Sequence, residues 1–173
     1  FGADGNNVPR VKRFLSEVKQ GVTPMSIWKY SEVGHSQEAA QSLKKLFNGK
    51  DYFDYPKPVE LIKRCIELYS EKDSIVMDFF SGSSTTAQSV MELNAKDEGC
   101  RQFIMVQLAE RIEEGTEAYN DGYRTICDIA KERIKLSGKK VKDESPLTTQ
   151  DLDTGFRVFR VDSSNYEEVE HTP

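Results

Sequence analysis

The fold is decided by residues 74–86, which read Ser-Ile-Val-Met-Asp-Phe-Phe-Ser-Gly-Ser-Ser-Thr-Thr. Five of the first seven residues are apolar, and the run closes in a turn of small residues. This length and pattern predict a buried parallel strand that enters a tight turn. The residues that follow fall at the spacing of one helix face, namely Ala87, Val90, Met91 and Asn94. We therefore predict a strand, a turn and the start of a helix, the junction at which open α/β sheets bind their ligands.

The composition of this turn suits close contact with a ligand. Gly and Ser let backbone N–H groups approach a ligand, and a carboxylate such as Asp78 at the strand end accepts hydrogen bonds from hydroxyl or ammonium groups. Gly82 is the residue that we expect least to tolerate a side chain. The alternative is an ordinary βα turn, in which Ser and Thr only cap the helix. The residues of this stretch leave both interpretations open.

Two more runs predict strands of the same sheet, residues 103–108 and 156–161. The first is continuously apolar, which is typical of a strand covered on both faces. The second is amphipathic and is expected at the edge of the sheet. Glu110 follows the first run, so it should arrive at the same sheet end as Asp78 and Gly82 and serve as a partner for ribose hydroxyls. The alternative is an acid in the first turn of a helix, favoured by the helix dipole.

Apolar periodicity predicts the helices that flank this sheet. One should begin at the N-cap Ser36 and end at Gly49, a second should cover residues 58–70, and a third should run from about 122 to 136 and end at Gly138. Arg133 is expected near the C-terminus of the third helix, where the dipole favours cations. The sequence therefore predicts an α/β fold of three parallel strands with flanking helices.

Composition limits the other possibilities. The chain has 173 residues, 37% of them hydrophobic, which suffices for one core, and its net charge of −5 argues against a wholly basic nucleic-acid surface. Residues 1–30 nevertheless hold five basic and two acidic residues. A short helix over residues 11–19 would display Arg10, Lys12 and Arg13, either as a solvated face or as a contact for DNA phosphates.

Cysteines and hydropathy exclude further classes of protein. The 3 cysteines are widely spaced and there are only 2 histidines, so neither a disulfide framework nor a zinc site is expected. No apolar run approaches the roughly 20 residues that cross a bilayer, and no signal-like segment opens the chain. We expect a cytoplasmic protein without membrane contact. The first residue is Phe1 rather than Met, which suggests a piece of a longer chain.

Residues 78–86 also carry a resemblance. Asp-Phe-Phe-Ser-Gly-Ser-Ser-Thr-Thr resembles the S-adenosylmethionine-binding motif of DNA amino-methyltransferases, whose usual form is Asp-x-Phe-x-Gly-Ser-Gly-Thr-Thr. The positions that match are Asp78, Phe80, Gly82, Ser83, Thr85 and Thr86. Ser84 stands where the family has its second glycine. This departure should either narrow the cofactor pocket or impose a strained φ.

The resemblance extends over most of the chain. Residues 1–5, 8–18, 32–35 and 156–165 resemble the modification subunit of type III restriction systems, which methylates the amino nitrogen of adenine in DNA. It implies S-adenosylmethionine as cofactor, with DNA and a restriction subunit as partners. It also implies that residues 1–35, including Arg10, Lys12 and Arg13, are a remnant of the target-recognition region, and that residues 36–173 form the cofactor-binding half. The residues that the resemblance places around the cofactor are Tyr55, Lys57, Asp78, Phe80, Gly82, Ser83, Ser84, Thr85 and Glu110.

The catalytic motif of that family, Asp-Pro-Pro-Tyr, has no counterpart here. None of the 6 prolines are adjacent, so we assign no catalytic residue. The resemblance then implies a partial Rossmann-like methyltransferase fold whose catalytic half of the sheet is missing. Such a chain should self-associate or pair with the complementary half, because one side of its sheet has nothing to cover it. The alternative is a non-catalytic, truncated Rossmann-like module for binding or interaction.

Overall fold

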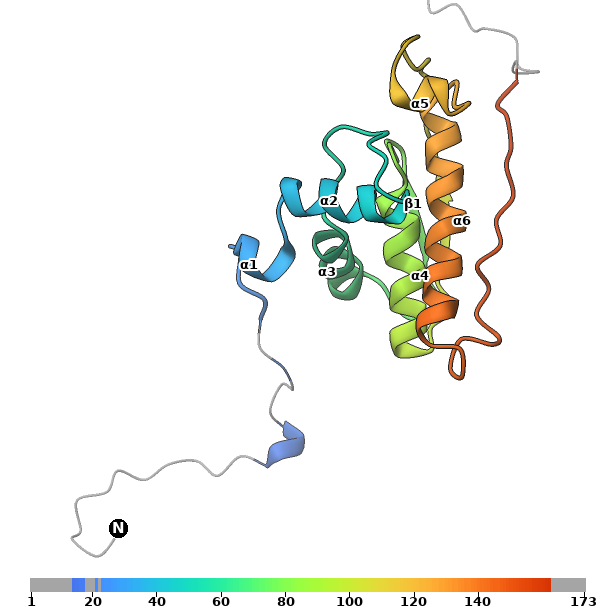
Figure 1. Ribbon diagram of the computed structural model, residues 1–173. Coiled ribbons are helices and arrows are strands. Elements are labelled where there is room, and N and C mark those ends of the chain that lie inside the picture. Colours follow the sequence, from blue (N-terminus) through green and yellow to red (C-terminus); the bar gives the residue numbers. More distant parts are fainter. Residues whose placement is uncertain (1–13, 18–20, 22, 163–173) are drawn as a thin grey trace, which may run out of the picture.

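The structure is a computed structural model that describes residues 14–17, 21 and 23–162 (Figure 1). Helices and two strands alternate along the chain, which confirms the predicted α/β class. The elements are η1 (Leu15–Glu17), α1 (Tyr30–Val33), α2 (Ser36–Leu46), α3 (Val59–Tyr69), β1 (Ile75–Asp78), α4 (Thr85–Asp97), β2 (Gln102–Met105), α5 (Glu117–Asn120) and α6 (Ile126–Glu144).

The sheet is a parallel pair. Ile75 lies opposite Gln102 and Asp78 opposite Met105, and α4 forms the crossover between the two strands. Two backbone hydrogen bonds continue the pairing past the strands, from the N–H of Val106 to the carbonyl of Asp78 (2.8 Å) and from the N–H of Ser81 to the carbonyl of Val106 (3.2 Å). The ordered strands are shorter than predicted because the chain turns directly after Asp78.

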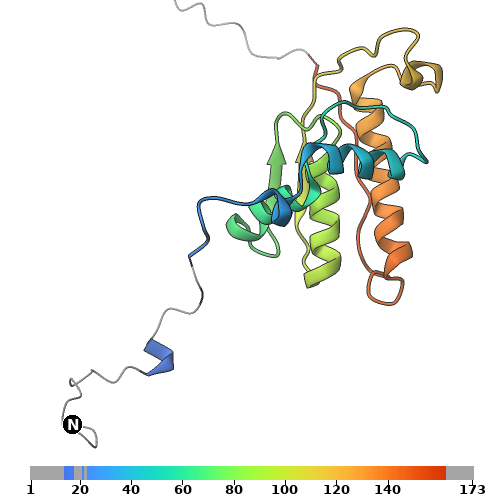
Figure 2. The same ribbon diagram turned by 60° about the vertical axis from the view of Figure 1, so that its left-hand side comes forward.

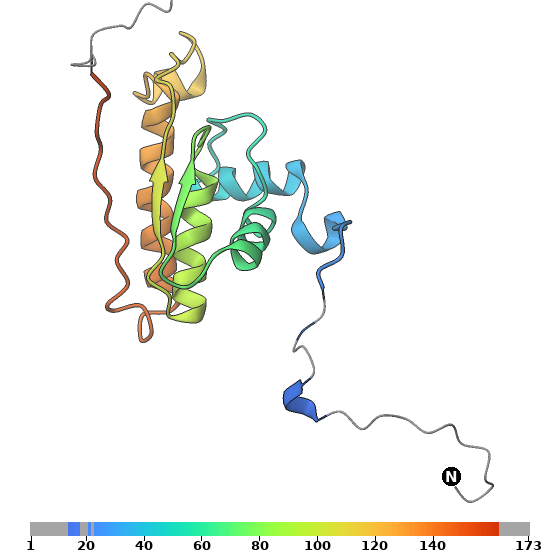
Figure 3. The ribbon, with the colours of Figure 1, turned by 180° about the vertical axis from the view of Figure 1, so that it is seen from behind.

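The prediction of a third strand over residues 156–161 is wrong. Within the described residues this segment is extended but pairs with no strand. The ring of Phe156 packs on Ala87, Met91 and Ile134, while the later apolar residues of the segment are exposed. One half-buried ring therefore anchors a segment that runs beside α6 (Figure 3), and the amphipathic pattern reflects this anchor rather than a ladder of hydrogen bonds.

Helices cover one face of the sheet. α4 packs against both strands, against α3 on one side and against α6 on the other, and α4 and α6 stand side by side in Figures 1 and 2. Ile66 of α3 meets Val90 and Leu93 of α4, and Met91 of α4 meets Ile134 of α6. As predicted, all four positions that showed helical spacing after the turn are buried.

The other face of the sheet is open. Apolar side chains project there from both strands and from the residues that follow them, namely Ile75, Met77, Phe79, Ile104, Val106 and Leu108. In Figure 3 the two strands lie in front of α4 and α6, and no described helix lies over them. The prediction that both faces of the strand at 103–108 are covered is therefore wrong within the described residues. The residues of this run instead alternate between an inner face that packs on the helices and an outer face that is uncovered.

α2 and α3 follow the predicted bounds closely. α2 buries Ala39 and Leu43, and Phe47 directly after the helix is also buried. Its N-cap is His35 rather than Ser36, since the Nδ1 of His35 accepts a hydrogen bond from the N–H of Glu38 (3.3 Å). α3 begins directly after Pro58, and its most buried residue is Ile66.

α6 is longer than predicted, and Gly138 does not end it. The helix continues to Glu144, and Gly138 lies inside it against the segment that returns at Thr154. A Cβ at Gly138 would stand 2.8 Å from the Cβ of Thr154, so a glycine is needed for this close approach. Arg133 is consequently in the middle of the helix and buried, rather than near its C-terminus.

The N-terminal expectations fall mostly outside the described residues. Of the short helix predicted over 11–19, residues 14–17 are described, and they contain only η1. Arg10, Lys12 and Arg13 lie outside the described residues. In the part of the chain that the structure covers, no helix is both long enough and apolar enough to span a bilayer.

Candidate functional site

The candidate site begins where β1 ends, at Asp78. One carboxylate oxygen, Oδ1, accepts a hydrogen bond from the N–H of Phe80 (3.1 Å), and the other, Oδ2, accepts one from the hydroxyl of Thr86 (2.6 Å). The half-buried carboxylate therefore ties the end of the strand to the first turn of α4. Strand, turn and helix meet as the sequence predicted.

The turn is closed by its own hydrogen bonds and by one long-range contact. Ser84 donates its N–H to the carbonyl of Ser81 (2.6 Å), and the N–H of Gly82 donates to Oε1 of Gln107 (2.7 Å). Gly82 has a φ of +49°, and Ser84 has a φ of +62°. Of the two effects predicted for a serine in place of the family's second glycine, the strained φ is confirmed.

The segment before α3 lies over this turn. A Cβ at Gly82 would stand 3.2 Å from Cζ of Phe53, which agrees with the expectation that this position does not accept a side chain. The hydroxyl of Thr85 donates to the carbonyl of Lys57 (3.4 Å), so the backbone of the Pro-Lys-Pro segment reaches the N-terminus of α4. The room above Gly82 is thus filled by an aromatic ring of the chain itself.

Two aromatic side chains of the predicted site are free at the surface. Phe80 is 90% exposed and Tyr55 is 82% exposed. Tyr55 also has a positive φ of 55°, which is uncommon for a bulky residue. Exposed rings beside a polar turn are able to stack on a planar ligand while hydroxyl and amide groups contact its polar parts.

Glu110 is not brought to the turn by a contact. Its backbone connects to the start of α6, because its carbonyl accepts the N–H of Ile126 (3.0 Å). Its exposed carboxylate makes no hydrogen bond within the described residues. Gln107 holds the position beside Gly82 instead. Sequence reasoning missed Gln107, although the register of Asp78 with Met105 places it two residues beyond the strand end.

Arg133 is the largest omission from the sequence prediction. Its side chain is 2% exposed, and its Nη1 donates to the hydroxyls of Ser83 (2.6 Å) and Thr85 (2.8 Å). Its Nε donates to Oε1 of Gln88 (2.9 Å). Burial lowers the pKa of Arg133 to about 10, so the guanidinium remains charged at neutral pH. The missed signal was its spacing of three and four residues from Ala130 and Ser137, which puts it on the buried stripe of α6.

A separate cavity of about 470 Å³ lies among α2, α3, α4 and α6. Its wall includes Leu43, Val59 and Leu136, and Gln88 and Arg133 also line it. None of the turn residues 78–86 lines this cavity, so it is not the predicted cofactor site. In the part of the chain that the structure describes, no three His, Cys, Asp or Glu side chains gather as metal ligands.

Comparison with known proteins agrees with this geometry. Residues 5–138 match the model of a family described as DNA methylase. The chain is 37% identical over 160 residues to the Mod subunit of the type III restriction-modification enzyme StyLTI from Salmonella typhimurium, covering 92% of this chain and 24% of the relative. It is 40% identical over 156 residues to the EcoPI Mod subunit of Escherichia phage P1, covering 90% of this chain and 23% of the relative.

A type II methyltransferase, M.KpnI of Klebsiella pneumoniae, is 33% identical over 141 residues, or 82% of this chain and 33% of the relative. The chain thus spans about a quarter of the length of the two Mod subunits. The resemblance seen in the sequence to type III modification subunits is confirmed. Since the family model covers well over half of its residues, the chain belongs to the DNA methylase family.

Proposed function

We propose that this chain is the S-adenosylmethionine-binding part of a site-specific DNA adenine methyltransferase of a type III restriction-modification system. The observation that carries the proposal is the junction of β1 and α4, where the residues that match the family's cofactor motif form one closed turn held by Asp78, Gln107 and Arg133. A partial Rossmann-like fold is part of this proposal.

The turn fits a cofactor of this kind. Ser84 adopts the left-handed conformation that a glycine would adopt freely, so the turn keeps a glycine-type path despite the serine. The proposed binding residues are Tyr55, Lys57, Asp78, Phe80, Gly82, Ser83, Ser84, Thr85 and Glu110. Phe80 and Tyr55 would contact the planar part of the ligand, and the exposed carboxylate of Glu110 would accept hydrogen bonds from its hydroxyls. When bound, S-adenosylmethionine supplies an activated methyl group.

The partners in this proposal are those of a modification subunit. Residues 1–35, with Arg10, Lys12 and Arg13, would be a remnant of the DNA target-recognition region, and residues 36–173 the cofactor-binding half-domain. DNA and a restriction subunit would bind the complete enzyme, in the cytoplasm. The names of the two related Mod subunits support this assignment.

The isolated chain is proposed to be inactive. The sequence contains no adjacent prolines and therefore no Asp-Pro-Pro-Tyr motif to activate the adenine amino group. The open apolar face of the sheet would be covered by the catalytic half of the enzyme or by a second copy of this chain, because exposed apolar patches of this kind mark interaction surfaces. The same absence of the motif favours a second candidate, a non-catalytic binding module.

Ligand binding tests the proposal directly. S-adenosylhomocysteine at about 1 mM should raise the melting temperature of the chain, because a ligand that binds only the folded state stabilises it by mass action. Gly82→Val should abolish the shift, since Gly82 has a positive φ and abuts Phe53. Gly115→Val is the matched control, because Gly115 also has a positive φ, +86°, but has no atom within 4 Å of an added Cβ. Absence of any shift in the unaltered chain would refute cofactor binding.

Methyl transfer separates the enzyme part from the non-catalytic module. We expect no transfer to DNA by the chain alone, and transfer when a fragment that carries the Asp-Pro-Pro-Tyr motif is added. Light scattering on the same samples should show self-association of the chain, or a complex with the fragment. Binding of S-adenosylhomocysteine without restored transfer favours the binding module. A monomer that methylates DNA unaided contradicts both the missing half and the proposed division of roles.

A further inference from the structure

Arg133 contacts the two residues on either side of the strained Ser84. A single nitrogen, Nη1, donates to the hydroxyl of Ser83 at 2.6 Å and to the hydroxyl of Thr85 at 2.8 Å. It also lies 3.5 Å from the carbonyl oxygen of Ser83. These contacts connect residues about 50 positions apart in the sequence. The turn is therefore fastened from outside at the two positions next to its unfavourable torsion angle.

The side chain of Ser84 does little to hold this conformation, and its backbone N–H bonds within the turn, to the carbonyl of Ser81 (2.6 Å). It has φ +62° and ψ +42°, it is 1% exposed, and its side chain makes no cap hydrogen bond to α4. A residue with a Cβ is disfavoured in this region and persists there only where surrounding contacts demand it. Without such contacts, the turn would relax to a conformation that a serine prefers.

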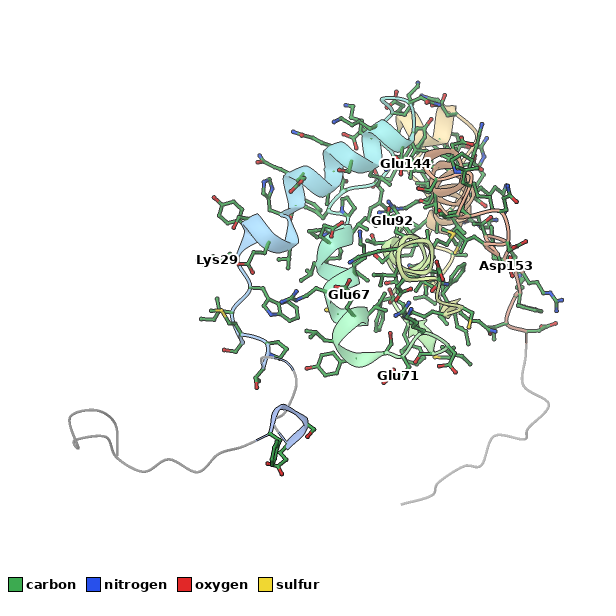
Figure 4. The ribbon with its side chains drawn as sticks, turned by 90° about the horizontal axis from the view of Figure 1, so that it is seen from below. Lys29, Glu67, Glu71, Glu92, Glu144 and Asp153 are labelled. Carbon is green, nitrogen blue, oxygen red and sulfur yellow. The ribbon has the colours of Figure 1, made fainter. Side chains whose placement is uncertain are left out.

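Electrostatics alone does not explain a cation at this place. Within the described residues Arg133 has no carboxylate at ion-pair distance, and the N-terminus of α4 carries a positive partial charge. The carboxylate of Glu92 attracts the guanidinium from beyond ion-pair distance, and Gln88 connects the two, since its Nε2 donates to Glu92 (2.8 Å). Glu92 in turn pairs with Lys63. Figure 4 shows α4, with Glu92 on it, between α3 and α6. What Arg133 supplies is a rigid fork of donors that meets several acceptors at once.

We infer that Arg133 is a positioning residue that holds the turn in the glycine-like conformation needed for the cofactor, where a serine has replaced glycine. The effect on ligand binding rests on the proposed function, whereas the effect on the turn does not. Loss of Arg133 should allow the turn to relax, so that the ligand must restore the strained conformation before it binds.

A double-mutant cycle without ligand tests the hold on the turn. The four proteins are the unaltered chain, Ser84→Gly, Arg133→Met and the double variant, and the measurement is the folding equilibrium constant from urea unfolding. With Arg133 present, Ser84→Gly removes strain that the turn cannot escape. With Arg133 replaced, the turn has already relaxed, so the same change gains less. We expect Ser84→Gly to be at least about threefold more favourable when Arg133 is present. Equal effects in the two backgrounds would overturn the inference.

Two further variants distinguish positioning from general support of the fold. Arg133→Lys keeps the charge but loses the fork, so it should behave like Arg133→Met in the cycle. Arg101→Met is the matched control, because Arg101 is also buried but contacts Asp97 near the other end of α4. It should reduce stability and show no coupling to Ser84→Gly. Coupling of the same size for Arg101 would mean that any destabilisation produces the effect, and the inference would fail.

Calorimetry with S-adenosylhomocysteine adds the functional readout. Arg133→Met should weaken binding at least about tenfold, and addition of Ser84→Gly should restore affinity to within about threefold of the unaltered chain. Loss of affinity without this rescue would overturn the role in ligand positioning. If no variant binds, the proposed function fails, while the unfolding cycle still decides whether Arg133 holds the turn.

Discussion

The two ends of α4 share two features, a left-handed residue and a buried arginine, but differ in what the arginine contacts. Each end has a non-glycine residue in the left-handed region, Ser84 before the helix and Glu98 after it. Each end also has a buried arginine, Arg133 from α6 at the N-terminal end and Arg101, four residues after the helix, at the C-terminal end. Ser84 is buried and lies in the stretch proposed to bind the cofactor, whereas Glu98 is exposed.

The partners of the two arginines differ in charge. Arg101 forms a two-pronged ion pair with Asp97, with Nη1 at 3.0 Å and Nη2 at 2.9 Å from the carboxylate oxygens, and the amide of Asn94 bonds to its backbone. Arg133 meets only neutral acceptors. The C-terminal end is therefore balanced within itself and serves the fold. At the N-terminal end the buried guanidinium is held by hydroxyl and amide oxygens instead, and the carboxylate of Glu92 acts on it from beyond ion-pair distance.

Replacement of the two arginines should change the free energy of unfolding most. Arg101→Met removes the guanidinium that pairs with the carboxylate of Asp97 and leaves that carboxylate with only the N–H of Gly99 among these donors, so we expect the free energy of unfolding to fall by about 3 kcal/mol. Arg133→Met also removes a cation that is costly to bury, so its loss should be nearer about 1 kcal/mol. Urea unfolding measures both. An Arg133 variant that is the less stable of the two would show that its neutral contacts are stronger than an ion pair.

Substitution of the glycines near the two ends of α4 should give the next largest losses of stability. A Cβ at Gly99 would stand 2.7 Å from Nη1 of Arg101 and 2.8 Å from Oδ1 of Asp97. Gly99→Ala should therefore displace the ion pair and lower the free energy of unfolding by about 2 kcal/mol without changing ligand affinity. Gly82→Ala should lower it by about 1 kcal/mol because of its positive φ, and should also weaken ligand binding. Melting curves with and without S-adenosylhomocysteine distinguish the two ends.

Acid should weaken the ion pair at the C-terminal end. The hydrogen bond from Arg101 holds the pKa of Asp97 below its ordinary value of 3.8. A lowered pKa in the folded state stabilises the protein above pH 3.8, and this contribution is lost as the pH falls through the folded value. Because Asp97 is partly exposed, we expect the contribution to be about 0.5–1 kcal/mol.

The control for this acid effect is Arg133, whose hydrogen-bond partners are neutral. Between about pH 6 and pH 2.5 the stability of Arg133→Met should fall as steeply as that of the unaltered chain, because serine, threonine and glutamine do not titrate. Arg101→Met should show a shallower fall. Urea midpoints at a series of pH values give the slopes, and identical slopes for all three proteins would contradict the assigned role of the ion pair.

Relief of backbone strain should give the smallest effects. Glu98→Gly should raise the free energy of unfolding by about 0.5–1 kcal/mol, because Glu98 is exposed and a glycine adopts its φ of +56° freely. Ser84→Gly should gain less, since it also loses a buried side chain, but it should tighten the binding of S-adenosylhomocysteine. Calorimetry on both variants measures the contrast. Equal affinities would mean that the strained turn has no part in ligand binding.

The sequence by itself determined the elements around this helix. The apolar run, the small-residue turn and the helical spacing after it are local signals, because strand, turn and helix preferences depend on a few neighbouring residues. The position of Ser84 in the motif gave a strained φ as one of two expectations, and the structure shows that φ. The family also followed from the sequence, since the order of Asp78, Gly82 and Thr86 is a local pattern.

Tertiary structure decided which distant residues complete the site. Gln107 and Arg133 reach the turn from 25 and 50 residues away, and Gly138 is required because Thr154 returns to it. Periodicity shows which residues lie on a buried face, but it does not show what that face meets. The predictions for the segment at 156–161 and for the open face of the sheet were wrong for the same reason. An apolar alternating pattern fits a paired strand, an anchored extended segment or an uncovered face equally well, and only the packing of distant elements selects among them.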